Sequence, residues 1–351
     1  MSPGGVFAHL PEAVRARLPA LDDPAWQGEA RADCARCPMA AAGGPHPWAF
    51  SPETRCCTAH PSLANFLVGR ALGRAGPGPA LIRARLADPD GVTAFGIEPS
   101  AARERRYRDT IDVAFGRDVT LRCPYWVGGD HSCGVWHDRG ATCRAWFCKH
   151  DHGLVGAVAW SRASFLVSEL EGRIARWCVG AGGAPAAPAD AAAWIAWYQA
   201  CAARVDALDD AAAATLLDGL APRRDELIEL RRGAGPRRRL DVEVLVPSVS
   251  ERVDRDGDVL LTGYSTFDAV RAPHAVFELL ARLDGRPWRA ALAEARAALA
   301  AAGDPAPWLD EALVAELRRV GALRDPAGGD DPPFEVELVG MDRWARAALD
   351  G

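Results

Sequence analysis

The chain is almost free of lysine and contains no long apolar run. Lys149 is the single lysine among 41 basic residues, so nearly all of the positive charge comes from arginine. No stretch approaches the roughly 18 consecutive apolar residues that a membrane-spanning helix needs. The opening residues, MSPGGVFAHLPEAV, lack the basic start and apolar core of a signal peptide. We therefore expect a cytoplasmic protein with no membrane partner, whose cysteines stay reduced.

Several signatures of enzymes and nucleotide-binding proteins are also missing. The sequence has no phosphate-binding P-loop, no glycine-rich dinucleotide fingerprint between a strand and a helix, and no Gly-x-Ser-x-Gly nucleophile motif. The C-x-x-x-C-x-x-C triplet of radical-SAM enzymes does not occur either. A net charge of -6 gives no basic surface for nucleic acid, so we expect no nucleic-acid partner.

Cysteine is unevenly distributed, because none of the ten cysteines lies in the last 150 of the 351 residues. Cys178 and Cys201 fall in apolar helical patterns and are expected to be core thiols. The other eight form a quartet with a C-x-x-C start and a CC pair, and a second quartet between residues 123 and 148. We predict that these eight are metal ligands: Cys34, Cys37, Cys56, Cys57, Cys123, Cys133, Cys143 and Cys148.

The stretch from residue 123 to residue 152 explains why a metal is expected. It is poor in aliphatic residues and interrupted by glycines and a proline, so it is not one regular helix or strand. Disulfides or a metal must hold it, and a reducing compartment favours the metal. Four thiolates per group suit either zinc or an iron–sulfur cluster, and the sequence leaves the choice between them open.

Histidines are secondary candidates within the same region. His60, His131, His150 and His152 lie near the cysteines and could each replace a thiolate, although a hydrogen-bonding role around the metal suits them better. If the metal is catalytic, one coordination position must be open to substrate. The polar groups to test first as proton donors or substrate-facing ligands are then His137, Asp138, His150 and Asp151. Lys149, between Cys148 and His150, is a further candidate for this site.

Apolar periodicity predicts a mainly α protein. Residues 63–74, 80–88, 101–115 and the long stretch 154–179 show helical spacing, and the last is expected to support the Cys-rich segment. Further helices are predicted at 193–208, 211–220 and 223–232. We assign residues 1–180 to a metal-binding domain with an irregular Cys-rich segment packed on helices, and 181–235 to a helical extension.

The last third of the chain has a different pattern. Residues 240–249 and 258–264 alternate like strands around an Asp-Gly turn at 256–257, and residues 334–339 are another strand candidate. Helices are predicted at 275–283, 287–302 and 308–320. We therefore expect residues 240–351 to form a small winged-helix-like α+β domain.

Residues 34–152 resemble the YkgJ-type cysteine-cluster proteins, a family of zinc- or iron-chelating domains. The shared features are the CC pair at Cys56–Cys57, the cysteine before an aromatic at Cys123, the glycine-flanked Cys133, and the ending CRAWFC. The gap between Cys37 and Cys56 is longer than in that family. The resemblance implies that all eight cysteines serve the metal.

Residues 241–325 resemble, more weakly, the PqqD-like winged-helix modules. The matching features are the hairpin, the Leu283-Asp284-Gly285 turn and the closing helix that leads to Gly321. This resemblance implies a peptide or protein partner that adds a strand to the sheet.

Two hypotheses for the function follow, and the sequence leaves open whether the protein is an enzyme. The favoured one is an iron–sulfur or iron protein that acts as a redox protein or oxidoreductase in peptide or protein modification. The alternative is a non-enzymatic binding or adaptor module that zinc stabilises.

Overall fold

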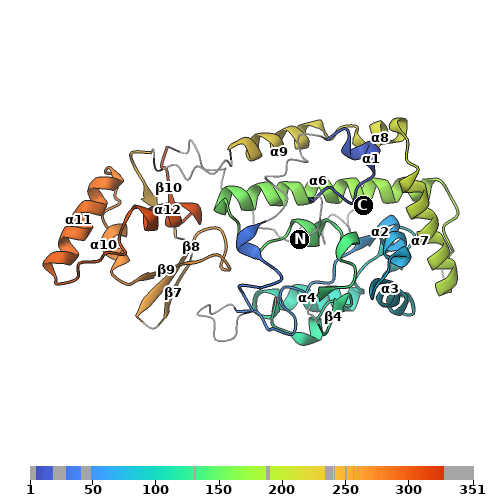
Figure 1. The fold of residues 1–351 in the computed structure, drawn as a ribbon, viewed down its shortest axis with the longest axis horizontal. Helices are drawn as coiled ribbons and strands as arrows, with labels where there is room; N and C mark the ends of the chain where they lie inside the picture. Colours follow the sequence, from blue (N-terminus) through green and yellow to red (C-terminus); the bar gives the residue numbers. More distant parts are fainter. Residues whose placement is uncertain are drawn as a thin grey trace. The chain divides into compact units, whose positions relative to one another are not determined.

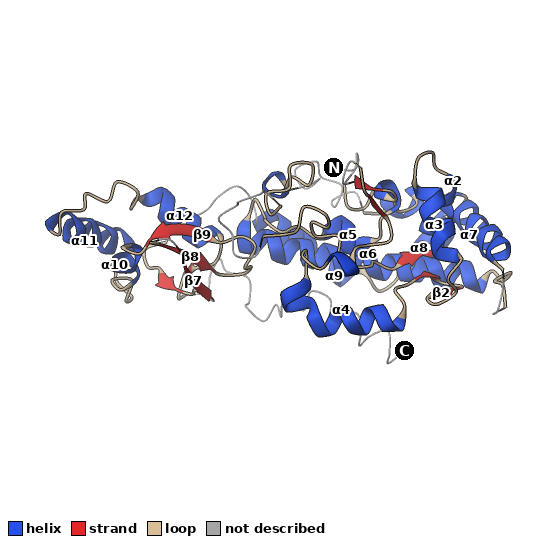
Figure 2. Cartoon of the chain, turned by 90° about the horizontal axis from the view of Figure 1, so that it is seen from below, coloured by secondary structure: helices blue, strands red, loops and turns tan. Residues whose placement is uncertain are grey.

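The computed structural model consists mainly of helices, in agreement with the mainly α prediction, and its strands are short (Figure 2). The structure describes residues 5–18, 29–40, 49–129, 132–186, 190–233, 240, 242–249, 251–255 and 257–327. The strand candidate at 334–339 and the end of the predicted winged-helix-like domain lie outside the described residues. None of the described helices is long and apolar enough to span a membrane.

Two compact units make up the chain, and neither is continuous in sequence. The first takes residues from 1–28, 33–146 and 161–228, and the second from 29–32, 147–160 and 229–351. The helix α6 (Gly153–Gly180), drawn in green in Figure 1, contributes residues to both. Its bounds confirm the helix that the sequence predicts at 154–179.

The first unit contains most of the helices. They are α1 (Glu12–Arg15), α2 (Asn65–Gly73), α3 (Gly78–Leu86), α4 (Ala101–Ala114), α5 (Ala141–Ala145), α7 (Ala191–Asp206), α8 (Asp210–Leu217) and the start of α9 (Ala221–Gly233). Two 3-10 turns, η4 (Val119–Leu121) and η5 (Trp136–Asp138), lie between them. Six of the helices, α2, α3, α4, α7, α8 and α9, begin within two residues of the predicted positions, because apolar spacing and capping residues are local signals. The Ser100 side chain, for example, accepts a hydrogen bond from the Arg103 amide at the start of α4. The sequence predicts no helix at α5.

Helices α2 and α7 pack closely enough that their contact requires a glycine. A β-carbon placed on Gly69 would lie 1.9 Å from the carbonyl oxygen of Tyr198, so only a residue without a side chain fits there. Arg70, the next residue, donates through Nη2 to a carboxylate oxygen of Asp206 at 2.5 Å. The apolar side of α2, with Phe66, Leu67 and Val68, is fully buried.

Two small antiparallel sheets complete the first unit. The strands β1 (Leu63–Ala64), β3 (Gly96–Ile97) and β2 (Val92–Thr93) pair in that order. The strands β4 (Trp126–Val127) and β5 (Ser132–Cys133) form a hairpin in which Trp126 lies opposite Cys133. The stretch from residue 123 to residue 152 is therefore a series of short elements, as expected from its glycines and proline.

The second unit contains a three-stranded antiparallel sheet and three helices. In chain order its elements after residue 229 are β6 (Val246–Pro247), β7 (Glu251–Arg255), β8 (Asp258–Thr262), β9 (Val270–Pro273), α10 (Val276–Leu280), α11 (Trp288–Ala301), α12 (Glu311–Arg319) and β10 (Leu323–Arg324). The short 3-10 turn η3 (Ala30–Ala32) also belongs to this unit. The sheet order is β7-β8-β9, and β6 pairs separately with β10. Its core surrounds Trp288, whose indole is fully buried and donates to the Val242 carbonyl at 2.8 Å.

One strand prediction is wrong. The sequence predicts a strand over residues 240–249, but within the described residues of that range only 246–247 form one, with an isolated bridge at Val244. The partner of β8 is β7 instead, with Arg255 opposite Asp258. A two-residue turn joins strands that directly flank it, so the Asp-Gly signal at 256–257 already required a strand ending at residue 255.

Candidate metal centre

Seven of the eight predicted cysteine ligands belong to the first unit, and the backbone links the segments that carry them. Arg55 donates through Nη1 to the Cys34 carbonyl at 2.6 Å, which connects the turn of the C-x-x-C pair to that of the CC pair. The Cys123 amide donates to the Cys57 carbonyl at 2.7 Å, which brings the third segment alongside. These two bonds join residues that lie 21 and 66 positions apart in sequence.

The last two of these seven cysteines lie on short regular elements. Cys133 ends strand β5, and the hairpin is closed by the Gly134 amide, which donates to the Tyr125 carbonyl at 2.8 Å. Cys143 lies in the first turn of α5. The start of α5 is fixed to α6, because the Ala141 amide donates to Glu171 Oε2 at 3.1 Å. Hydrogen bonds between strands thus position Cys133, and a hydrogen bond at the start of a helix positions Cys143.

The sulfur atoms of these seven cysteines act on one another electrostatically, and we call them the seven-thiol group. Burial raises the pKa of the Cys123 thiol, and the neighbouring Cys143, Cys57 and Cys133 thiols raise it further. Burial also raises the pKa of Cys133 to about 11 and that of Cys143 to about 12. These sulfurs are therefore neutral thiols at neutral pH unless a cation lies beside them.

Cys57 differs from these three. A hydrogen bond with the Cys56 side chain lowers the pKa of the Cys57 thiol, burial opposes this, and the guanidinium groups of Arg139 and Arg55 lower the pKa further. Cys34 is the most exposed of the seven, but the surrounding chain desolvates its sulfur enough to raise its pKa, while Arg139 acts in the opposite direction. Cys57 therefore ionises more readily than Cys34 and the three thiols above, whose pKa values are raised.

Arg139 is a feature of the site that the sequence did not single out. Its positive charge lowers the pKa of four thiols, those of Cys34, Cys57, Cys133 and Cys143. The side chain is held in place by stacking on Trp136, at 3.6 Å from the ring centroid, and by donating to the Trp136 carbonyl. Arginine is so common in this chain that one more, in an apparent Asp-Arg-Gly turn between two cysteines, gave no distinct signal.

The positions of the possible ligand side chains differ from those of a complete metal site. Within the described part of the chain, no group of three or more Cys, His, Asp or Glu side chains is placed so that it could hold one. The donor chemistry nevertheless fits a thiolate-binding metal, because several neighbouring sulfurs share one desolvated region beside a guanidinium. Binding would require these sulfurs to lie closer together than they do here.

His60 and Tyr125 provide a second observation about the site. Their rings contact edge to face, with centroids 5.7 Å apart. Both nitrogens of His60 and the hydroxyl of Tyr125 are buried and make no hydrogen bond with any described residue. Buried polar atoms of this kind need a partner, and the imidazole follows Cys57 by three residues. His60 is therefore a nitrogen donor available to a ligand.

Cys148 belongs to the second unit, where the residues after it are fixed by a buried polar network. Lys149 donates to the Phe267 carbonyl at 2.6 Å, and the His150 amide donates to the Tyr264 hydroxyl at 3.2 Å. The Arg319 guanidinium donates to the His150 carbonyl at 2.9 Å. Lys149 thus anchors its segment to the second unit, and Cys148 remains a predicted ligand on sequence grounds.

Two other predicted polar groups also have structural partners. Asp138 is buried, and its two carboxylate oxygens accept from Arg74 at 2.5 and 3.0 Å, so it is an ion-pair partner. Asp151 accepts from the amides of Ala30 and Arg31, both at 2.9 Å, and so caps the 3-10 turn η3.

The remaining histidine candidates fall into three environments. His150 is buried beside Tyr264, and burial lowers its pKa to about 4. His137 is exposed and His152 is half-buried. His131 lies outside the described residues, so its role as a ligand stays a prediction.

Cys178 and Cys201 confirm the prediction of core thiols. Both side chains are fully buried, one in α6 and one in α7. The Cys178 thiol donates to the Cys201 carbonyl at 3.8 Å. All ten cysteines lie among the described residues, and none of them forms a disulfide bond.

No protein-family model, curated protein or solved structure matches this chain. The resemblances to the YkgJ-type and PqqD-like families therefore rest on the sequence motifs, and the site must be judged from its own residues.

Proposed function

We propose that the protein binds a metal, as an iron–sulfur cluster or as zinc, through cysteine thiolates. The observation that carries this proposal is the seven-thiol group, in which cysteines from separate stretches of chain act on one another and Arg139 acts on four of them. Neutral buried thiols that repel one another when ionised gain most from a bound cation, because it offsets both burial and repulsion. His60 is the nitrogen donor best placed to join or support the ligands.

The ligands in this proposal are the predicted cysteines, and Arg139 is their charge partner. A metal centre with several thiolates carries net negative charge, which a nearby guanidinium stabilises and whose reduction potential it raises. An iron–sulfur cluster would supply one-electron transfer, and zinc would supply a rigid cross-link. We favour a redox protein or oxidoreductase that acts in peptide or protein modification.

The alternative function, a binding module that zinc stabilises, is supported by the short elements of the Cys-rich stretch. Strands β4 and β5 and helix α5 have two, two and five residues, too few to be stable without tertiary support. A metal that holds such elements in place contributes directly to folding.

For the second unit we propose a winged-helix-like module that binds a peptide or protein. Its support is the order β7-β8-β9 with three helices, which leaves β7 paired on one side among the described strands. The other side of an edge strand presents amide and carbonyl groups to which an extended peptide can pair.

The metal proposal is tested by purifying the full chain without oxygen and measuring bound iron, zinc and sulfide. Iron with sulfide and a broad absorption near roughly 400 nm supports the redox function. Colourless protein with stoichiometric zinc supports the binding module. Cys57→Ser and Cys143→Ser should each lower the metal content, because each removes one thiolate of the group.

The matched control is Cys178→Ala, which removes a buried core thiol from α6 and should leave the metal content unchanged. Chain that carries no metal under both reducing and metal-supplemented growth would contradict the proposal. Equal losses in Cys178→Ala and Cys57→Ser would show that the metal effect follows stability and not ligation.

A further inference from the structure

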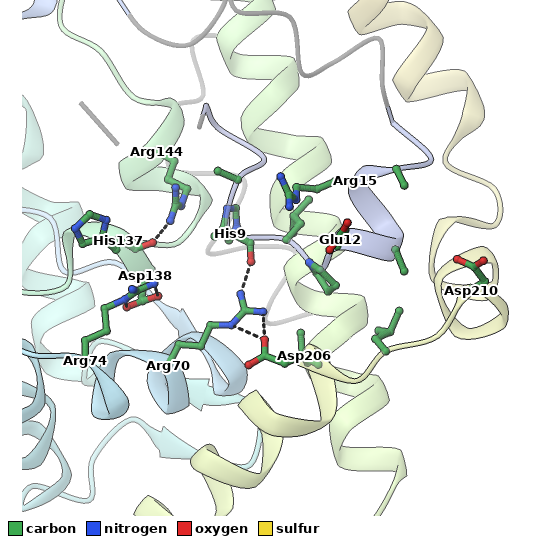
Figure 3. A pocket seen from close by; sticks show the side chains of 17 residues that line it. His9, Glu12, Arg15, Arg70, Arg74, His137, Asp138, Arg144, Asp206 and Asp210 are labelled. Atoms are coloured by element: carbon green, nitrogen blue, oxygen red, sulfur yellow. Dashed lines mark hydrogen bonds and ion pairs between the residues drawn. The ribbon is translucent and has the colours of Figure 1, made fainter. Parts of the chain in front are cut away.

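A cavity of about 740 Å³ opens in the first unit, on the side of α1 and α2 (Figure 3). Its wall carries four arginines, Arg15, Arg70, Arg74 and Arg144, together with His9 and His137. Its size is that of a small-molecule site. The side chains come from segments far apart in sequence, so the tertiary fold and not a local motif creates this concentration of arginine.

Two of the four arginines already neutralise carboxylates of the same wall. Arg74 binds both oxygens of Asp138, and Arg70 donates to Asp206 at 2.5 Å through Nη2 (Figure 3). A third wall carboxylate, Asp210, accepts from Arg17, which is not part of the wall, at 2.7 Å. These pairs leave the charges of Arg70 and Arg74 satisfied within the protein.

Arg144 and Arg15 are different, because neither has a carboxylate within ion-pair distance among the described residues. Arg144 is 6 % exposed and donates to backbone carbonyls, those of Arg139 at 2.6 Å and of His137. Arg15 Nε is buried and has no hydrogen-bond partner in the described part of the chain. A guanidinium nitrogen can only donate, so what Arg15 lacks is an acceptor.

His9 adds a buried polar group to the same wall. The imidazole is held by Glu171 of α6, with 2.6 Å between Nε2 and Oε1, and Nδ1 has no hydrogen-bond partner among the described residues. A carboxylate on one ring nitrogen fixes the orientation of the ring and sets the other nitrogen to bond elsewhere.

We propose that this cavity binds a small molecule through an oxyanion, a carboxylate or a phosphate group, with Arg15 and Arg144 as its cationic contacts. Guanidinium groups bind both oxyanions with paired, charge-assisted hydrogen bonds. The wall also holds four carboxylates, but Glu12 is exposed and the three aspartates are paired with arginines. The anion therefore meets two guanidinium groups, those of Arg15 and Arg144, that have no carboxylate partner among the described residues. The site is independent of the thiol–metal proposal, since none of its contacts is a cysteine.

Calorimetric titration of the full chain with inorganic phosphate, and separately with succinate, tests the proposal at constant ionic strength. Saturable binding of either anion at one site per chain is expected. Arg15→Gln should weaken it about tenfold or more, because a hydrogen bond between charged groups is lost. Arg17→Gln is the matched control, because Arg17 lies two residues away but outside the cavity wall, and should leave the affinity unchanged.

Each outcome has a defined meaning. Binding of phosphate identifies a phosphate ligand, and binding of succinate a carboxylate ligand, and both are consistent with the site. Absence of binding for both anions, or equal weakening by Arg15→Gln and Arg17→Gln, overturns the proposal. Arg144→Gln is a second variant, read by the same titration after circular dichroism shows a folded chain. Measuring iron and zinc in the same samples separates this result from the metal proposal, because chain without metal can still bind the anion.

Discussion

Single charged residues determine much of the local structure of this protein. Arg139 lowers the pKa of four thiols, and Arg144, five residues later, holds the carbonyls of the same loop. The loop between Cys133 and Cys143 therefore contains one arginine that acts on the sulfurs, and a second arginine, directly after Cys143, holds this loop and lies in the cavity wall. Because Arg144 donates to the Arg139 carbonyl, a substitution of either arginine is expected to shift the position of the other.

The buried ion pair of Asp268 and Arg319 leads to a prediction about the stability of the second unit. Two hydrogen bonds join them, at 2.5 and 2.9 Å, and both side chains are 1 % exposed. Asp268→Ala would leave this buried guanidinium with one carboxylate partner, the partly exposed Glu316 at 2.9 Å. We therefore expect the free energy of unfolding of the second unit to fall by about 3 kcal/mol. Urea denaturation followed by circular dichroism measures the change.

Asp258→Ala is the control for this prediction. Asp258 binds Arg271 at 2.6 Å in the same sheet, but both side chains reach solvent, so its removal should cost less than about 1 kcal/mol. The double variant Asp268→Ala/Arg319→Met should recover part of the loss, because it also removes the buried guanidinium that has lost its buried carboxylate. Similar effects of the two single aspartate variants would argue against a critical buried pair.

At the scale of elements, the contact between α2 and α7 is the most constrained. Gly69→Ala would place a methyl group 1.9 Å from the Tyr198 carbonyl oxygen and 2.9 Å from the Ala202 β-carbon. The helices must separate to admit it, so we expect the first unit to lose about 1 to 3 kcal/mol of stability. Thermal unfolding of the variant measures the loss.

Gly73→Ala is the matched substitution in the same helix. A β-carbon there would have nothing within 4 Å, and replacing a helical glycine by alanine stabilises by up to about 1 kcal/mol. The two variants should therefore change the melting temperature in opposite directions. A lowered melting temperature for both would show that α2 does not tolerate alanine for reasons other than the α7 contact.

The elements also show what could be predicted from the sequence. Helices α4, α6 and α11 lie within about two residues of their predicted bounds, because apolar periodicity and caps are encoded locally. The strand predicted at 240–249 failed, because alternation does not say which segment pairs with β8. The partners of Lys149 and the role of Arg139 depend on residues distant in the chain, so no local pattern reveals them.

At the scale of the whole molecule, buried histidines predict how stability changes with pH. Burial lowers the pKa of His60 to about 3, and burial also lowers the pKa of His9 in the same unit. The unfolded chain takes up these protons below about pH 6.5 and the folded chain does not. The first unit should therefore lose up to about 1.4 kcal/mol for each pH unit below that value because of His60, and His9 acts in the same direction.

The second unit should respond less to pH. Burial lowers the pKa of His150 to about 4, which destabilises the unit as the pH falls below about 6.5. Burial raises the pKa of Glu29 to about 7. Between about pH 7 and about pH 4.5 the folded chain therefore binds a proton that the unfolded chain does not. This proton stabilises the folded unit as the pH falls. The two effects oppose each other over the same range.

Amide hydrogen exchange at about pH 7 and about pH 5.5, corrected for the intrinsic exchange rates, measures the stability of both units in one sample. Protection should fall in the first unit and change little in the second. Equal changes in the two units would show that these histidines and Glu29 do not control the pH response.

The second unit is assembled from three stretches of the chain, 29–32, 147–160 and 229–351. A gene fragment that starts at codon 240 would encode Tyr264, Asp268 and Arg319 but not the backbone of His150 that they bind. Such a fragment would expose this buried network to water and lose the small core residue Ala157. Recombination that exchanges contiguous pieces of genes therefore cannot transfer this unit intact, and its part after residue 229 should be inherited together with the segment 147–160.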